Sequence, residues 1–237
     1  MKIDLVSDIS CPWCAIGLHA LEQALRRVAP HIQATLHVQP FELNPAMAAE
    51  GEDIVEHLAH KYGISAEQIA ANTEGIRQRG AALGFTFSQG KRSRIYNTFE
   101  AHRLLHWAGL QSPAAQLQLK HALFAAYFTE GLNPGDHAVL RRLVSEIGLD
   151  VEAAQAVLSS HAFADEVRQA QAFYQQQGIR SVPAVIINDR HLISGGQPVE
   201  VFEQALRQIA AIPRSISAPS ASAASMPSTP ADMIPPA

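Results

Sequence analysis

Hydrophobic and polar positions in the first forty residues predict a strand, a helix and a second strand. Residues 3–8 are typical of a short strand. From about Cys14 to Ala29, apolar residues recur every three or four positions, as in an amphipathic helix, and Pro30 ends the segment. Residues 32–38 then alternate between apolar and polar side chains, which is typical of a half-buried strand. The chain is therefore predicted to begin with a β-α-β unit.

The middle of the chain, from about Met47 to Ser160, has an almost wholly helical pattern. The pattern is broken only at Gly, Pro, Asn and Asp positions. Ser65, Ser112 and Asp136 have side chains that cap helix N-termini. The predicted helices are 52–62, 65–83, 95–107, 113–128, 136–147 and 150–159.

A β pattern returns near the end of the chain. A helix is predicted over 161–177, followed by the continuous apolar run 184–187, which is typical of a central strand covered on both faces. Residues 191–193 are predicted to form its antiparallel partner, and 198–211 a last helix. Residues 214–237 are mostly Ser, Ala and Pro without apolar periodicity, which predicts a disordered tail.

Composition and charge narrow the class of protein. With 237 residues, 47% of them hydrophobic, the chain can bury a core without disulfides or metals. The net charge of −4 lacks the basic excess typical of nucleic-acid binders. No stretch approaches the roughly 18 apolar residues of a membrane span, and acidic residues interrupt the N-terminal segment where a signal peptide would be apolar. We expect a soluble, cytoplasmic protein with no nucleic-acid or membrane partner.

Both cysteines lie in one motif, Ser10-Cys11-Pro12-Trp13-Cys14, where the first strand meets the first helix. Free amides and the positive end of the helix dipole favour a thiolate at Cys11. Pro12 suits the first helical position because its missing N–H loses no bond. Cys14 lies one turn further on, within reach of the Cys11 sulfur. This spacing permits both steps of thiol–disulfide exchange, with attack by Cys11 and resolution by Cys14.

The cysteine pair and three other features each have a structural and a functional interpretation. The cysteine pair could be half of a zinc site or two inert thiols, but zinc needs four ligands and no second pair exists. His102 and His106 lie four residues apart without a third ligand, so no metal site is predicted. The basic run 91–94 is predicted to be a solvated loop, with attraction of a glutathione carboxylate or acidic substrate as the alternative. Residues 194–198 are predicted to end a strand, with a substrate contact left open.

The segment before the late apolar strand offers a possible partner for the cysteines. Pro183 cannot donate to a sheet and belongs at the first position of a strand. A cis Val182–Pro183 bond would expose the Val182 backbone to an extended peptide beside the cysteines. A plain trans proline that starts the strand is the alternative.

Five ordered segments resemble the thioredoxin superfamily, specifically DsbA-like oxidoreductases of the FrnE type. The 2-hydroxychromene-2-carboxylate isomerases and kappa-class glutathione transferases are related families. The segments are 7–14, 40–45, 97–104, 123–128 and 178–184, and they span nearly all of residues 1–212.

The resemblance implies an α/β thioredoxin fold, β-α-β followed later by α-β-β-α, with a large inserted all-helical domain. The thioredoxin-like domain would comprise residues 1–45 and 161–213. The helical insertion would comprise residues 46–160, and the tail residues 214–237.

The resemblance also implies roles for individual residues. Cys11 would be the exposed nucleophile and Cys14 the resolving thiol, with a cis-proline loop of Val182 and Pro183 packed against their helix. Phe41, Asn97 and the helical insert would help to roof the active-site groove.

Two residues near the cysteines argue against the strongly oxidising chemistry of periplasmic DsbA proteins. Trp13 stands where those proteins have a histidine that favours the thiolate. Asp8, close in sequence, would oppose the negative charge of the thiolate. We therefore expect a weaker oxidant.

The sequence predicts a DsbA-family thiol–disulfide oxidoreductase that exchanges, reduces or isomerises disulfides in peptides or small molecules. No bound cofactor is expected. We consider glutathione as a co-substrate. We consider a homodimer as the oligomeric state. One alternative is a glutathione-dependent isomerase or transferase, although in those relatives serine usually replaces the first cysteine. A second alternative is a peptide-binding, chaperone-like module whose cysteines are incidental.

Overall fold

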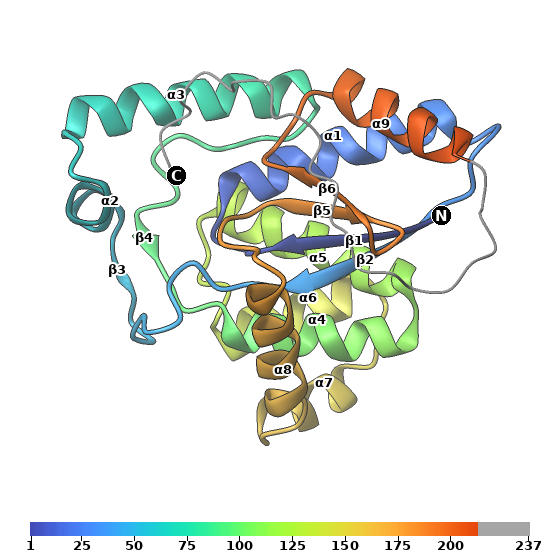
Figure 1. Cartoon of the computed structure of the whole chain (residues 1–237). Coiled ribbons are helices and arrows are strands. Elements are labelled where there is room, and N and C mark those ends of the chain that lie inside the picture. Colours follow the sequence, from blue (N-terminus) through green and yellow to red (C-terminus); the bar gives the residue numbers. More distant parts are fainter. Residues whose placement is uncertain (213–237) are drawn as a thin grey trace.

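A four-stranded mixed sheet forms the centre of the computed structural model, which describes residues 1–212 (Figure 1). The tail predicted over 214–237 lies outside the described residues. Strand β1 runs parallel to β2 and antiparallel to β5, and β6 pairs with β5, so the order is β2-β1-β5-β6. The strands are β1 (Lys2–Ser7), β2 (Thr35–Pro40), β5 (Ala184–Ile187) and β6 (His191–Ser194). The predicted central strand 184–187 is confirmed, and it is buried apart from Ile186.

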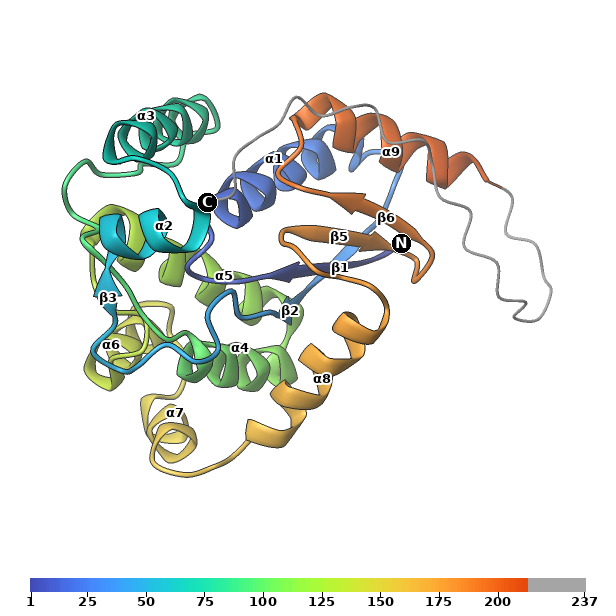
Figure 2. The same cartoon turned by 60° about the vertical axis from the view of Figure 1, so that its left-hand side comes forward.

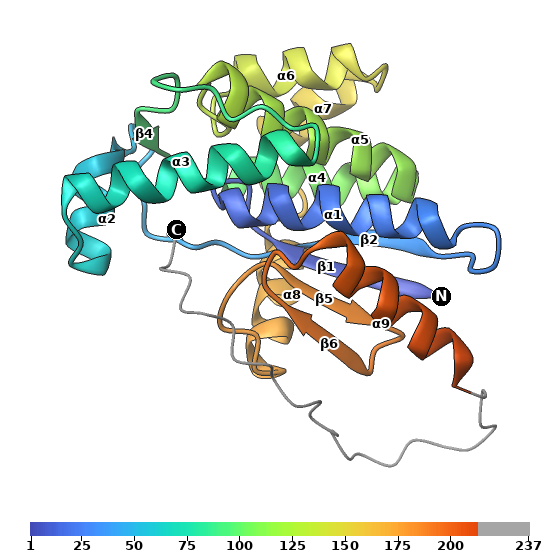
Figure 3. The same cartoon turned by 90° about the horizontal axis from the view of Figure 1, so that it is seen from above.

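Helices cover both faces of this sheet. Figure 2 shows α1 (Pro12–Val28) and α9 (Val199–Ala211) on one face and α4 (Phe99–Gln111) and α8 (Ala164–Gln176) on the other. Seen from above, α3 (Ala66–Ala82) and α9 flank α1 on its two sides (Figure 3). The N-terminal end of α1, which carries the cysteines, therefore lies between the sheet and helices from the middle of the chain.

The middle of the chain is helical, as predicted, and the predicted caps are confirmed. Ser65 forms a capping box with Gln68, Ser112 accepts from the Ala115 N–H, and Asp136 from the Val139 N–H. The remaining helices here are α2 (Ile54–Tyr62), α5 (Pro113–Phe124), α6 (His137–Glu146) and α7 (Val151–Leu158).

Two predictions for this region are wrong in detail. The insertion is not wholly helical, because β3 (Glu52–Asp53) and β4 (Arg94–Ile95) pair antiparallel. Gly51, at φ +68°, permits this approach: a Cβ there would lie 2.2 Å from the Ile95 carbonyl oxygen. The helix predicted over 113–128 ends as an α-helix at Phe124 and continues as a π-helix, η1 (Ala125–Glu130). Apolar spacing over so short a stretch does not distinguish these two windings.

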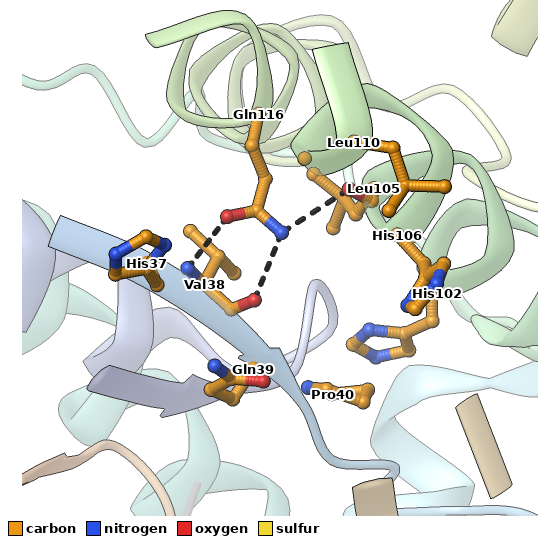
Figure 4. A pocket seen from close by; sticks show the side chains of 10 residues that line it. His37, Val38, Gln39, Pro40, His102, Leu105, His106, Leu110 and Gln116 are labelled. Atoms are coloured by element: carbon orange, nitrogen blue, oxygen red, sulfur yellow. Dashed lines mark hydrogen bonds between the residues drawn. The ribbon is translucent and has the colours of Figure 1, made fainter. Parts of the chain in front are cut away.

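The outer edge of β2 is closed by one side chain from α5. The Val38 N–H donates to Gln116 Oε1 at 2.8 Å, and Gln116 Nε2 donates to the Val38 carbonyl at 3.0 Å (Figure 4). Gln116 Nε2 also lies 3.2 Å from the Leu105 carbonyl of α4. The amide thus replaces a neighbouring strand and anchors α5 against the sheet.

Replacement of Gln116 by methionine should leave the buried N–H and C=O of Val38 without partners. Unsatisfied buried groups of this kind cost roughly 1–3 kcal/mol each, so we expect the free energy of unfolding to fall by about 3 kcal/mol. Urea denaturation measures this loss. Gln208→Met, at an exposed position of α9, is the control and should change stability by less than about 0.5 kcal/mol. Equal effects of the two substitutions would contradict the edge-closing role.

Candidate functional site

The two cysteines lie at the N-terminal end of α1, at the predicted junction. Cys11 is the N-cap residue with extended backbone, and Pro12 is the first helical residue. Both thiols are free, and the Cys14 N–H donates to the Cys11 carbonyl at 3.1 Å. The first turn of the helix thus places the two side chains one above the other.

The loop before β5 lies against the cysteine end of α1. The Val182–Pro183 bond is cis, the isomer that the resemblance implies. The Cys11 thiol donates to the Val182 carbonyl, with the sulfur 3.6 Å from the oxygen. The two segments, which are far apart in the sequence, therefore meet at the Cys11 sulfur.

Two glycines allow this close approach. A Cβ on Gly17 would lie 3.0 Å from Pro183 Cγ, and one on Gly196 would lie 2.9 Å from the Trp13 carbonyl oxygen. Residues 194–198 connect β6 to α9, so the predicted strand-ending role is confirmed. Their glycine content also serves the packing of α1.

The Cys14 thiol is buried slightly more completely than the Cys11 thiol. Cys14 is fully buried. Burial, followed by the hydrogen bond and negative charge of Cys11, raises the pKa of Cys14 well above its ordinary value. A lone buried thiol of this kind stays protonated at neutral pH unless a partner takes its proton.

Cys11 is only 2% exposed, so the exposed nucleophile that the resemblance implied is not what the structure contains. The Val182 loop covers it on one side, and the end of α2 contributes Lys61 and Tyr62 nearby. Burial lowers the pKa of Lys61, against the negative charges of Asp8 and Cys11, and burial with the Cys11 charge raises the pKa of Tyr62. The sequence pattern gave no sign that α2 would lie over the cysteines.

The carboxylate of Asp8, 1% exposed, is the centre of a hydrogen-bond network. It accepts from the Ser10 hydroxyl, the Leu43 N–H and the Thr98 hydroxyl, each at 2.8 Å. His102 Nε2 lies 3.5 Å away. Burial alone would raise the pKa of Asp8, but His102, Leu43 and Thr98 together lower it to about 2. Asp8 is therefore ionised at every pH at which the protein would work.

The two histidines of α4, His102 and His106, contact other side chains of the fold. His102 faces the Asp8 carboxylate, and the His106 ring lies 5.2 Å from that of Phe163. Both line one pocket beside β2 with His37 (Figure 4). Among residues 1–212, no group of three or more His, Cys, Asp or Glu residues could hold a metal ion. No helix in this part of the chain is long and apolar enough to cross a membrane.

The basic run 91–94 is only in part the solvated loop that we predicted, because Lys91 and Ser93 are exposed whereas Arg92 and Arg94 are half-buried. Arg92 donates to the Ser10 carbonyl at 3.1 Å, and its guanidinium lies 4.9 and 5.0 Å from the rings of Tyr127 and Phe128. Arg94 donates to main-chain carbonyls at the β3–β4 pair. Arg92 thus binds the insert to the cysteine loop, whereas Arg94 binds two segments of the insert to each other.

The other predicted site residues, Trp13, Phe41 and Asn97, differ in what they contact. Arg79 of α3 lies over the Trp13 ring at 5.1 Å. Phe41 is buried in a small cluster against which Val182 packs. The Asn97 amide is occupied by backbone, because it donates to the Met47 carbonyl and accepts from the Phe99 N–H. Phe41 thus joins the Val182 side, whereas Asn97 orders the start of α4.

Sequence reasoning missed several residues near the site. They are Lys61, Tyr62, Arg79, Thr98 and Lys120. Only Lys120 left a usable sign, a cation between Leu119 and the apolar residues 122–124 of the helix predicted over 113–128.

Comparisons with known proteins agree on the family. The model of the DSBA-like thioredoxin domain matches residues 2–207. A Streptomyces coelicolor protein described as a probable DsbA oxidoreductase is 32% identical, with 93% of this chain and 94% of that chain covered and a TM-score of 0.84. YwbO, an uncharacterized protein of Bacillus subtilis, is 27% identical over 207 residues, which is 87% of this chain and 96% of YwbO.

A structure of 2-hydroxychromene-2-carboxylate isomerase shares the fold at 16% identity, with 92% of this chain and 100% of that chain covered and a TM-score of 0.68. The predicted thioredoxin fold with a large, mainly helical insertion is thereby confirmed.

Replacement of Asp8 by asparagine should make stability less dependent on pH. A carboxyl whose pKa falls to about 2 on folding contributes stability that is present above pH ~4 and is lost as pH falls through about 2. We expect Asp8→Asn to lower the free energy of unfolding by about 2 kcal/mol at pH 7, with the difference vanishing near pH 2. Asp165→Asn, at an exposed position of α8, is the control. A difference that stays constant across this range would contradict the account of Asp8.

Proposed function

The chain belongs to the DSBA-like thioredoxin family, and from this membership we propose that it is a thiol–disulfide oxidoreductase. Its redox pair is Cys11 and Cys14 of the Cys-Pro-Trp-Cys motif. The observation that carries the proposal is the placement of the two free thiols one turn apart at a helix N-terminus, with the Cys11 sulfur 3.6 Å from the Val182 carbonyl. In this arrangement one sulfur reacts with a substrate, and the other lies one helical turn away for the second step.

Cys11 makes the first attack. Its position at the N-cap places it against the free amides and positive dipole end of α1, which favour the thiolate. The thiolate forms a bond to one sulfur of the substrate disulfide, and the other substrate sulfur leaves with the electron pair and takes up a proton. The product is a mixed disulfide between Cys11 and the substrate.

Cys14 resolves the mixed disulfide. Its thiolate attacks the Cys11 sulfur, and the second substrate sulfur leaves as a thiol. The substrate disulfide is thereby reduced to two thiols, and the two cysteines are oxidised to one disulfide. Complete burial and the raised pKa of Cys14 support this order, because they keep it a thiol until Cys11 has reacted.

Substrate approaches along the Val182 side. The end of α2 brings Lys61 and Tyr62 near Cys11, and Phe41 and Val182 pack in one small cluster. An extended peptide would pair with the Val182 backbone in place of the Cys11 thiol. With Cys11 only 2% exposed, a substrate must first displace part of this cover.

The direction of the reaction follows from the charges around Cys11. Asp8 is ionised and buried, and it adds a negative charge next to the cysteine loop, where it accepts from the Ser10 hydroxyl. Trp13, packed under Arg79, supplies no imidazolium to offset it. We therefore propose a weak oxidant that favours disulfide reduction or isomerisation, with Pro12, Trp13 and Asp8 as the tuning residues.

Several finer predictions accompany this proposal. Residues 46–160 are proposed to be an insertion in a thioredoxin-like domain of residues 1–45 and 161–213. Glutathione as a co-substrate, peptide substrates, a homodimer and a cytoplasmic location stay predictions, as does any relation to FrnE-type members in particular. Substrate contacts of Phe41 and Asn97 likewise stay predictions.

The order of attack is tested by single-cysteine variants. We expect Cys14→Ser to form a stable mixed disulfide with a fluorescent peptide disulfide, and Cys11→Ser to form none, because only Cys11 is proposed to meet substrate. Mass spectrometry of the intact protein measures the adduct. The double Ser variant is the control for non-specific labelling.

An adduct that forms equally on both single variants would contradict the assigned order. Turnover of a glutathione conjugation that survives in Cys14→Ser, without any mixed disulfide, would favour the isomerase or transferase instead.

A further inference from the structure

Lys120 of α5 is a lysine in the hydrophobic core. Its side chain is fully buried, and its Nζ has no hydrogen-bond partner among the described residues. The Nζ lies 4.7 Å from the centre of the Phe124 ring, whose residue is one helical turn further along α5. Burial lowers the pKa of Lys120 to about 8, against the opposing charges of Cys14, Asp8 and Cys11. A buried amine without a partner lowers the free energy of unfolding, so we expect this lysine to serve a function.

The segment formed by α5 and η1 lies alongside α1, as contacts at two places along it show. Near the middle of α1, His121 Nε2 lies 3.0 Å from Glu22 Oε1. At the start of α1, Arg92 rests on the Phe128 ring and donates to the Ser10 carbonyl. The two segments are therefore antiparallel, and the turn between residues 121 and 128 runs alongside the part of α1 that carries the cysteines.

The Lys120 amine points into that region. It lies over the ring of Phe124, a residue of the stretch between His121 and Phe128. Cys14, Phe124 and the neighbouring Leu119 and Leu123 belong to one buried cluster. The groups whose charges act on Lys120 are Cys14 of α1, the N-cap residue Cys11, and Asp8 of the preceding loop. Of these, Cys14 is the one that must lose a proton in order to react.

We propose that Lys120 is the proton acceptor for Cys14 in the resolving step. The proposal rests on the oxidoreductase function and adds to it a residue of the insert. The Cys14 S–H proton passes to the neutral Lys120 amine, and the Cys14 thiolate attacks the Cys11 sulfur. The bond between Cys11 and the substrate sulfur breaks, and that sulfur leaves with the electron pair and takes a proton from solvent. In the reverse direction the Lys120 ammonium returns the proton to Cys14.

The reaction with an aromatic disulfide separates the two steps. Reduced protein mixed with 5,5′-dithiobis(2-nitrobenzoate) releases one coloured thiolate when Cys11 attacks and a second when Cys14 resolves. For the wild-type protein we expect the rate of the second release to rise with pH around a midpoint near 8, where Lys120 loses its proton.

Lys120→Met removes the amine and keeps a similar volume. We expect its second release to be about tenfold or more slower at pH 7–8, with the rise moved to higher pH, and its first release to stay within about twofold. Its stability should equal or exceed that of the wild type, because an unpaired buried charge is removed. Leu119→Met, a buried change on the same helix, should leave the pH profile of the second release unchanged.

A Lys120→Met protein with wild-type rate and pH profile in the second release would overturn the proposal. If this variant does not fold, a wild-type profile without a rise near pH 8 overturns it equally. Absence of both releases from the wild-type protein would instead contradict the oxidoreductase function itself.

Discussion

The buried carboxylate of Asp8 holds together the segments that meet beside the cysteine pair. It ties the loop that contains Ser10 to the segment at Leu43 and to the start of α4 at Thr98. A buried charge is tolerated only where donors surround it, and here the donors come from three separate parts of the chain. The conformation of the cysteine loop thus depends on the correct docking of the helical insert against the sheet.

The insert does more than cover the active-site helix. Arg92 reaches from the insert to the Ser10 carbonyl, Arg79 lies over Trp13, and Lys120 is buried in the core against Phe124. The thioredoxin-like part supplies the two sulfurs and the Val182 loop. The insert supplies cations that contact the cysteine loop and the Trp13 ring, so the surroundings of the thiols include charges from outside the part of the fold that carries them.

Local pattern was sufficient for most of the fold. Side-chain periods of two and of about 3.6 located the strands and helices, and Ser65, Ser112 and Asp136 located helix starts. The β3–β4 pair and η1 could not be predicted, because they depend on contacts such as the approach of Gly51 to Ile95.

For the site, the sequence located the cysteines and the Val182 loop. It missed the burial of Cys11 and the internal partners of Arg92, since both arise from tertiary packing.

The central claim is that Cys11 and Cys14 form a reversible redox pair. The most direct measurement is equilibration of the protein in glutathione buffers of graded potential, followed by alkylation of free thiols and mass analysis. We expect both thiols to become protected from alkylation together, in one two-electron transition, as an internal disulfide forms. Two thiols that stay alkylatable across the range, or that only acquire glutathione separately, would contradict the account.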